Sequence, residues 1–238
     1  MIKIGYDERA AFDENTGNDI ESVARVKKLL KDDIKRACVI PCSNKRNIDL
    51  CKLFDFVIFC DINDKIIASF SGSEYSNFSA MRMDIMNILP LSIDIILVMR
   101  QAIQMFTKDE IIKIVKSIRE KTNAKYILID TFYYDGKDLA EAPNYFTDTI
   151  EVFDINNKIY LKRNTIINIE VEKIILIHRY VYDGKEKYEA RVNLINYTRA
   201  DLTDIFCGAG LGITYVFESE RIDKPVHSNR SIFLLKVS

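Results

Sequence analysis

The 238-residue sequence has no excess of charge of either sign, because 34 Lys and Arg residues stand against 35 Asp and Glu residues. Nucleic acids and anionic membrane surfaces attract proteins chiefly through a positive field. The sequence therefore favours a small-molecule partner or a neutral protein, and we expect no nucleic-acid partner. An oligomer is compatible with this composition.

Long apolar runs are also missing. No segment approaches the ~18 apolar residues that a membrane-spanning helix needs, and the first residues, MIKIGYDERAAF, lack the apolar region of a signal peptide. We expect a globular cytoplasmic protein with no membrane partner. The five cysteines form no C-x-x-C pair, which favours free buried thiols over a zinc site or a disulfide framework, and we expect no metal.

Glycine is scarce, with eight residues in the chain, and no G-x-G-x-x-G fingerprint occurs. The stretch VIPCSNKRN (39–47) follows an apolar run and lies about twenty residues before Asp61, where a nucleotide-binding fold normally has its glycines. Glycine tolerates positive φ and lets a ligand approach the backbone. Three interpretations are open: a cofactor loop with altered contacts, a loop that has lost binding, or a simple turn.

Apolar runs typical of buried strands alternate with helical patterns in the first 132 residues. The best helix signal is 107–123, where Thr107 and Glu110 form a capping box and positions 111, 114, 115 and 118 make one apolar face. Further helices are predicted at 18–31, 47–54 and 64–72, and strands at 37–40, 56–61, 79–85, 93–99 and 124–132. This alternation predicts an α/β fold: a mostly parallel sheet with helices on both faces.

From about residue 150 the pattern changes to β-branched and aromatic residues with partial alternation. We predict a strand-rich insertion at about 150–197, with a hairpin around Asp183-Gly184. A helix that starts at Thr198 and ends near Gly208 follows, and then two strands, 213–219 and 231–237. No low-complexity linker separates these parts, so we expect residues 1–238 to form a single domain.

This order of elements resembles the class I S-adenosylmethionine-dependent methyltransferases of the small-molecule type, whose Rossmann-like sheet ends in an antiparallel strand pair. In that family the first strand leads to a turn such as D-x-P-C-G-N-G-R-N. The stretch 39–47 keeps Pro41, Cys42, Asn44, Arg46 and Asn47. It has Val39 in place of the acid, and Ser43 and Lys45 in place of the two glycines.

The resemblance implies S-adenosylmethionine as the cofactor. It assigns Asp61 to the two ribose hydroxyls. Taken alone, Asp61 is equally compatible with a cap for the next helix, but its spacing from Cys42 favours the ligand role. The resemblance assigns Asp84 to the adenine amino group, with an exposed loop aspartate as the alternative. The full set of cofactor-binding residues that it implies is Tyr6, Pro41, Cys42, Ser43, Asp61, Ile62, Asp84, Ile85, Met99 and Arg100.

Methyl transfer is an in-line displacement, so the protein mainly positions the acceptor, with a base where the acceptor is protonated. His178 is the preferred base over His227, because the insertion is expected to face the substrate; a structural role for this strand histidine is the alternative. Gln101 follows a buried strand at a position that faces the substrate in the family, although it can instead begin the next helix. Tyr145 and Arg191 are predicted to bind the substrate.

The predicted function is methylation of a small-molecule nitrogen or oxygen. Loss of the two glycines motivates a second hypothesis, a non-catalytic methyltransferase-like binding or regulatory subunit. A nicotinamide-dependent oxidoreductase is a third hypothesis, which the missing glycine fingerprint and the expected C-terminal strand pair disfavour.

Overall fold

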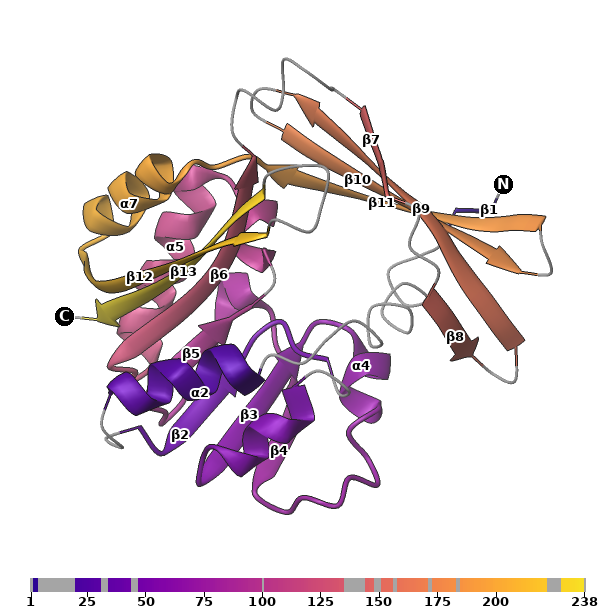
Figure 1. The fold of residues 1–238 in the computed structure, drawn as a ribbon. Coiled ribbons are helices and arrows are strands. Elements are labelled where there is room, and N and C mark those ends of the chain that lie inside the picture. Colours follow the sequence, from indigo (N-terminus) through magenta and orange to yellow (C-terminus); the bar gives the residue numbers. More distant parts are fainter. Residues whose placement is uncertain are drawn as a thin grey trace.

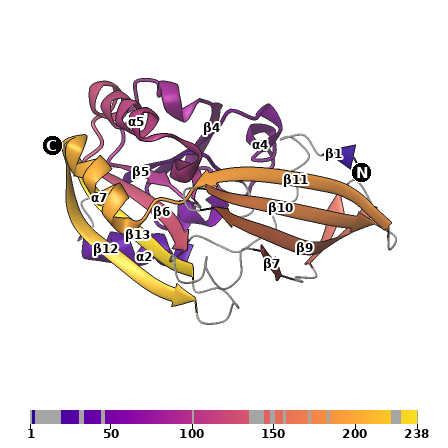
Figure 2. The ribbon, with the colours of Figure 1, turned by 90° about the horizontal axis from the view of Figure 1, so that it is seen from above.

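The computed structural model describes residues 2–3, 20–30, 34–43, 47–99, 101–134, 144–147, 151–155, 158–170, 173–182, 185–221 and 228–237. These residues form two β-sheets (Figure 1). Helices pack on the larger, central sheet, and the second sheet extends from one end of it (Figures 1 and 2).

The central sheet has seven strands in the order β12-β13-β6-β5-β2-β3-β4. Neighbouring strands from β4 to β6 are parallel, whereas β13 is antiparallel to both β6 and β12. The strands are β2 (Arg36–Val39), β3 (Phe56–Asp61), β4 (Phe78–Arg82), β5 (Ile95–Val98), β6 (Tyr126–Tyr134), β12 (Leu211–Arg221) and β13 (Ser228–Val237). The predicted fold class, including the closing antiparallel pair, is confirmed.

Helices cover both faces of this sheet and bury two apolar clusters against it. One face carries α2 (Ile20–Leu29), η1 (Ile48–Lys52) and α4 (Asp64–Ala68). The other carries η2 (Ile85–Asn87), η3 (Ala102–Met105), α5 (Lys108–Lys121) and α7 (Arg199–Gly208). The central strands β3 and β5 are buried on both sides, as their continuous apolar runs predict, whereas the edge strands β4 and β12 are partly exposed. Within the described residues, none of the helices combines the length and apolar character that crossing a bilayer requires.

Local sequence signals explain where the long helices begin. The Thr107 hydroxyl accepts a hydrogen bond from the Glu110 amide at 3.4 Å, and the Glu110 carboxylate accepts one from the Thr107 amide at 2.7 Å. The predicted capping box of α5 is therefore confirmed, and its four apolar positions are buried. Thr198 and Asp201 form a second capping box at the start of α7.

The second sheet contains β1 (Ile2–Lys3), β7 (Asn144–Thr147), β8 (Glu151–Ile155), β9 (Lys158–Glu170), β10 (Lys173–Tyr182) and β11 (Lys185–Ile195). Its order is β1-β11-β10-β9-β7, with β8 also paired to β9. Strands β10 and β11 are antiparallel, as the predicted hairpin requires. The N-terminal strand β1, which the sequence did not indicate, pairs in parallel with β11. The division into one domain stays a prediction.

Candidate functional site

The loops that follow β2, β3, β4 and β5 meet at the carboxyl edge of the central sheet, because these strands are parallel. Backbone hydrogen bonds hold the loops together. The Cys42 amide donates to the Cys60 carbonyl, and the Met83 amide donates to the Asp61 carbonyl, each at 3.0 Å. The structure thus gathers most of the predicted cofactor residues along one edge.

The loop after β2 contains the first glycine replacement, Ser43. The Ser43 amide donates to the Asn47 side-chain oxygen at 2.7 Å, and the Asn47 amide donates to the Ser43 carbonyl at 3.0 Å. Among the described non-glycine residues, only Gln101 has a positive φ. Ser43 therefore adopts a backbone conformation that does not need glycine, and Asn47 closes the turn. Pro41 lies just before it, after a cis peptide bond. Lys45, the second replacement, lies outside the described residues.

Two buried polar atoms at this edge have no hydrogen-bond partner among the described residues: the Ser43 hydroxyl oxygen and the Asn63 side-chain nitrogen. Ser43 is 8% exposed and Asn63 is 5% exposed. Leaving such a group unpaired in the interior costs about 1–3 kcal/mol. Both atoms lie at the carboxyl edge, where ligands bind in open α/β sheets.

Asp61 ends β3 and is buried, with 1% of its surface exposed. One carboxylate oxygen accepts a hydrogen bond from the Asn63 amide at 2.9 Å. The helix cap itself is Asn63, whose side-chain oxygen accepts from the Lys65 amide at 2.9 Å. Asp61 therefore supports the turn before α4 without being its N-cap. Ile62, between them, is exposed.

Asp84 lies two residues beyond the end of β4 and is exposed. The predicted strand 79–85 is therefore too long at this end, because the Asp84 carboxylate accepts from the Met86 amide at 2.9 Å and starts η2. The adjacent Met83 and Ile85 are buried and apolar. This part of the edge offers a carboxylate beside apolar side chains.

The end of β5 carries Met99, which is buried, and Gln101. Gln101 has φ 64° and ψ 7°, a left-handed conformation that is uncommon for a residue with a side chain. Its amide donates to the Asp130 carbonyl at 2.9 Å. Such strain often occurs at functional sites. Arg100, between the two, lies outside the described residues, as do Tyr6 and His227.

An ion pair near this edge was not predicted. The Arg230 guanidinium donates to both carboxylate oxygens of Asp130, at 2.8 and 3.0 Å. It also lies 5.7 Å from the Phe132 ring centroid and reaches the Ser22 hydroxyl of α2 at 3.5 Å. An acid within the apolar run of β6 was the available signal, but its partner lies 100 residues away in the sequence.

Three predicted residues lie on the second sheet, at positions where the backbone alone is described. His178 is on β10, opposite Thr165 and Ala190. Tyr145 is on β7 and Arg191 is on β11. Their roles stay predictions.

All five cysteines are free; four are buried, as expected, whereas Cys207 is exposed. The Cys38 and Cys60 sulfurs are 3.7 Å apart in the core. This hydrogen bond and burial hold the pKa of the Cys38 thiol well above its ordinary value, so the thiol is protonated at neutral pH. Among the described residues, no three His, Cys, Asp or Glu side chains gather as a metal site requires.

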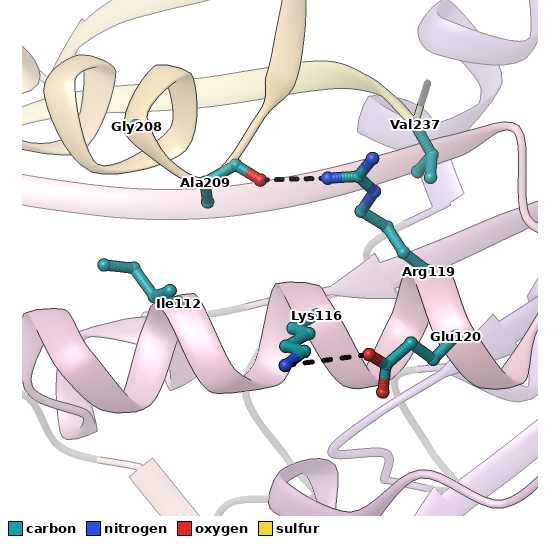
Figure 3. A pocket seen from close by; sticks show the side chains of 7 residues that line it. All are labelled: Ile112, Lys116, Arg119, Glu120, Gly208, Ala209 and Val237. Atoms are coloured by element: carbon teal, nitrogen blue, oxygen red, sulfur yellow. Dashed lines mark hydrogen bonds and ion pairs between the residues drawn. The ribbon is translucent and has the colours of Figure 1, made fainter.

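A surface hollow lies between the C-terminal parts of α5 and α7, away from the carboxyl edge (Figure 3). Arg119 donates to the Ala209 carbonyl at 3.4 Å and so satisfies the end of α7. Lys116 and Glu120 face each other at 3.8 Å on the exposed surface of α5. The Arg119 contact joins α5 to the end of α7, whereas the exposed Lys116–Glu120 pair contributes little.

No family model matches the sequence, and no curated protein matches it either. Solved structures do match. A S-adenosylmethionine-dependent methyltransferase from Clostridium acetobutylicum superposes with TM-score 0.70 and 14% identity, covering 95% of this chain and 94% of that chain. The amino pentose methyltransferase CalS10 from Micromonospora echinaspora, involved in calicheamicin biosynthesis, has TM-score 0.67 and 11% identity over 100% and 99% of the two chains.

The sugar N-methyltransferase KedS8 from Streptoalloteichus superposes with TM-score 0.66 and 11% identity, covering 98% of this chain and 94% of that chain. These matches include the second sheet as well as the central one, because they cover nearly the full chain. At such identities the likeness concerns the fold. The chain therefore has the fold of the class I S-adenosylmethionine-dependent methyltransferases.

Proposed function

We propose that this protein is a S-adenosylmethionine-dependent methyltransferase that acts on a nitrogen or oxygen of a small molecule. The observation that carries the proposal is the carboxyl edge of β2 and β3, where the buried Asp61 lies beside two buried polar groups, of Ser43 and Asn63, that have no partner in the described structure. In this fold, that edge is where ligands bind.

The residues at the edge suit the parts of the cofactor. Asp61 would accept hydrogen bonds from the ribose hydroxyls, and Asp84 would accept one from the adenine amino group. Met83 and Ile85 would contact the adenine ring, together with Ile62. The Ser43 hydroxyl would bind the methionine end; its amide is already engaged by Asn47. The bound cofactor supplies an electrophilic methyl group on a sulfonium.

Met99 and Arg100 would contact the sulfonium region of the cofactor, and Gln101 would face the acceptor. The chain's task is then to orient the nucleophile and exclude water. His178 is the proposed base for a protonated acceptor, and Tyr145 and Arg191 are the proposed substrate contacts. Two of the similar structures are methyltransferases of an amino pentose and of a sugar nitrogen, which supports a small, polar acceptor.

Titration calorimetry with S-adenosylmethionine and S-adenosylhomocysteine tests the cofactor assignment. We expect saturable heat for both, and we expect Asp61→Asn to weaken binding at least about tenfold through loss of a charge-assisted hydrogen bond. Asp64→Asn is the matched control, because Asp64 lies three residues further on and pairs only at the surface, with Arg82 at 3.3 Å. An absence of heat at millimolar ligand would overturn the proposal.

The non-catalytic alternative rests on the replaced glycines at 43 and 45. It predicts cofactor binding without turnover. Incubation with S-adenosylmethionine and a panel of amino sugars and hydroxylated small molecules, followed by detection of S-adenosylhomocysteine, separates the two functions. Product that forms with one acceptor and disappears in Asp61→Asn supports the enzyme.

A further inference from the structure

Beyond the end of β5, the side chain of Gln104 continues the hydrogen bonding along the edge of β6. The last β5–β6 pair is Val98 with Ile129, and the Gln101 amide then reaches the Asp130 carbonyl. At Phe132 the side-chain amide of Gln104 takes over. Its oxygen accepts from the Phe132 amide at 3.0 Å, and its nitrogen donates to the Phe132 carbonyl at 2.7 Å. Gln104 thus makes the two bonds that a residue of an adjacent strand would make.

The same nitrogen makes a third bond, to the Ile195 carbonyl at 3.1 Å. Ile195 is the last residue of β11, so this bond reaches the second sheet. A primary amide has two N–H donors, and both are used here. Gln104 is fully buried, with 0% of its surface exposed. One side chain of η3 therefore joins β6, the segment after β5 and the end of β11.

We propose that Gln104 is a positioning residue that couples the second sheet to the carboxyl edge of the central sheet. Gln104 lies three residues after Gln101, and the Gln104 amide donates to the Gln101 carbonyl at 2.8 Å. A ligand that contacts Met99 or Gln101 therefore lies next to η3, the short helix whose Gln104 side chain is hydrogen-bonded to Ile195. The identity of that ligand rests on the proposed function; the coupling itself does not.

A purely local role makes a different prediction. If Gln104 only satisfied the open edge of β6, its removal would expose Phe132 to exchange and lower stability, but the amides of β11 would not respond. Hydrogen exchange measured by mass spectrometry separates these roles, because peptides covering 56–61, 126–134 and 185–195 report on β3, β6 and β11.

The first variant is Gln104→Met, which keeps the length and removes all three bonds. Without ligand, we expect amides of 185–195 to exchange about tenfold faster, the equivalent of one lost hydrogen bond, while 56–61 is unchanged. Tyr197→Phe is the matched control. It removes a bond from the same connection, Tyr197 hydroxyl to Phe106 carbonyl at 3.0 Å, without touching β6. Unchanged exchange at 185–195 in Gln104→Met would overturn the proposal.

A second arm adds S-adenosylhomocysteine. In the unsubstituted protein, we expect the ligand to slow exchange at 185–195. In Gln104→Met, we expect affinity within about threefold of the original, because no bond to the ligand is lost, but no slowing at 185–195. Slowing that persists in Gln104→Met, or that never occurs in the original protein, contradicts the coupling. Failure of the ligand to bind contradicts the proposed function instead, and the ligand-free arm still decides the role of Gln104.

Gln104→Glu is a second variant, which tests the same bonds if Gln104→Met does not fold. The introduced carboxylate would face the carbonyls of Phe132 and Ile195 when ionised, whereas the protonated acid would donate to one of them. We expect protection at 185–195, corrected for intrinsic exchange, to be weaker than in the original protein at pH 8 and partly restored at pH 5. Equal protection at both pH values would overturn the proposal.

Discussion

The two ends of the central sheet handle their polar groups in different ways. At the amino end, Asp94 accepts hydrogen bonds from the Lys35 and Arg36 amides, both at 2.9 Å, and its own amide donates to the Arg36 carbonyl at 2.9 Å. At the carboxyl end, buried atoms of Ser43 and Asn63 have no partner among the described residues. The chain itself satisfies the polar groups around Asp94, whereas the two atoms at the carboxyl end are unpaired, as the proposed cofactor site requires.

This difference separates stability from function within one sheet. The Asp94 side chain at the amino end is satisfied in the folded chain, so its removal should cost stability and leave ligand binding intact. Side chains at the carboxyl edge are held in less favourable surroundings, and Gln101 adopts a left-handed backbone there. Their removal should cost binding and leave stability unchanged or higher. The Asp130–Arg230 pair is the exception at the carboxyl end, because it is satisfied internally.

The largest effect is expected from that exception. Asp130→Ala leaves the Arg230 guanidinium, whose side chain is 20% exposed, without its carboxylate. We expect a loss of about 3–5 kcal/mol in the free energy of unfolding, measured by urea denaturation. Asp130→Leu combined with Arg230→Met should recover much of this loss. A loss below about 1 kcal/mol in Asp130→Ala would show that water replaces the carboxylate. The pair would then contribute little to stability, like the unpaired groups of Ser43 and Asn63.

At the amino end, Asp94→Ala removes two hydrogen bonds to the start of β2. We expect a loss of about 1–2 kcal/mol in the free energy of unfolding. The affinity for S-adenosylhomocysteine, measured by calorimetry on the folded variant, should not change. A matching loss of affinity would show that the two ends are not independent.

How far the sequence predicts this structure depends on the distance over which each signal acts. The apolar runs and the Thr107–Glu110 box are local patterns, and they predicted the strands and α5. Asp61 was placed correctly at the end of β3 because an apolar run fixes where that strand stops. The contacts of Gln104 and Asp130 are different. They join residues 28 to 100 positions apart, so nothing in either neighbourhood identifies the partner.

The loop after β2 lies between these cases. The sequence indicated that Ser43 replaces a glycine, but it did not indicate that Asn47 would bond both the amide and the carbonyl of Ser43. Helix α4 starts at Asp64 because the Asn63 side chain caps it, and the sequence did not decide between Asp61 and the residues after it as the cap. The pairing of β1 with β11 joins residues 186 positions apart, Ile2 with Tyr188.

Ser43→Ala gives the sharpest comparison between the two ends. The variant removes a buried hydroxyl that has no partner in the described structure and keeps the backbone bonds to Asn47. We expect the free energy of unfolding to stay the same or rise by about 1 kcal/mol, because an unsatisfied polar group is lost. The affinity for S-adenosylhomocysteine should fall about fivefold to tenfold, through loss of one hydrogen bond. Thr122→Ser, at a satisfied hydroxyl far from the edge, is the control. Lower stability with unchanged affinity would show that the Ser43 hydroxyl stabilises the fold and does not bind the ligand.

The smallest effect on stability is expected at the exposed start of α5. This helix begins near the carboxyl edge of the sheet, but Thr107 and Glu110 satisfy each other's polar groups there. Hydrogen bonds from the amide and hydroxyl of Thr107 hold the pKa of Glu110 below its ordinary value. A lowered pKa in the folded state means that the carboxylate stabilises the protein at neutral pH, and that this contribution is lost as the pH falls through the folded pKa. Solvent screening keeps the contribution small.

Glu110→Gln should therefore lower the melting temperature slightly at pH 7, and the difference from the original protein should vanish in acid. Glu120→Gln, on the same helix, makes the same change of charge without touching the capping box. Melting temperatures measured from pH 3 to pH 7 check both variants. If the difference in melting temperature instead grew as the pH fell, the capping box could not be its cause. In that case, a polar side chain that is hydrogen-bonded within the chain would not necessarily stabilise the fold, and the comparison between the two ends of the sheet would fail.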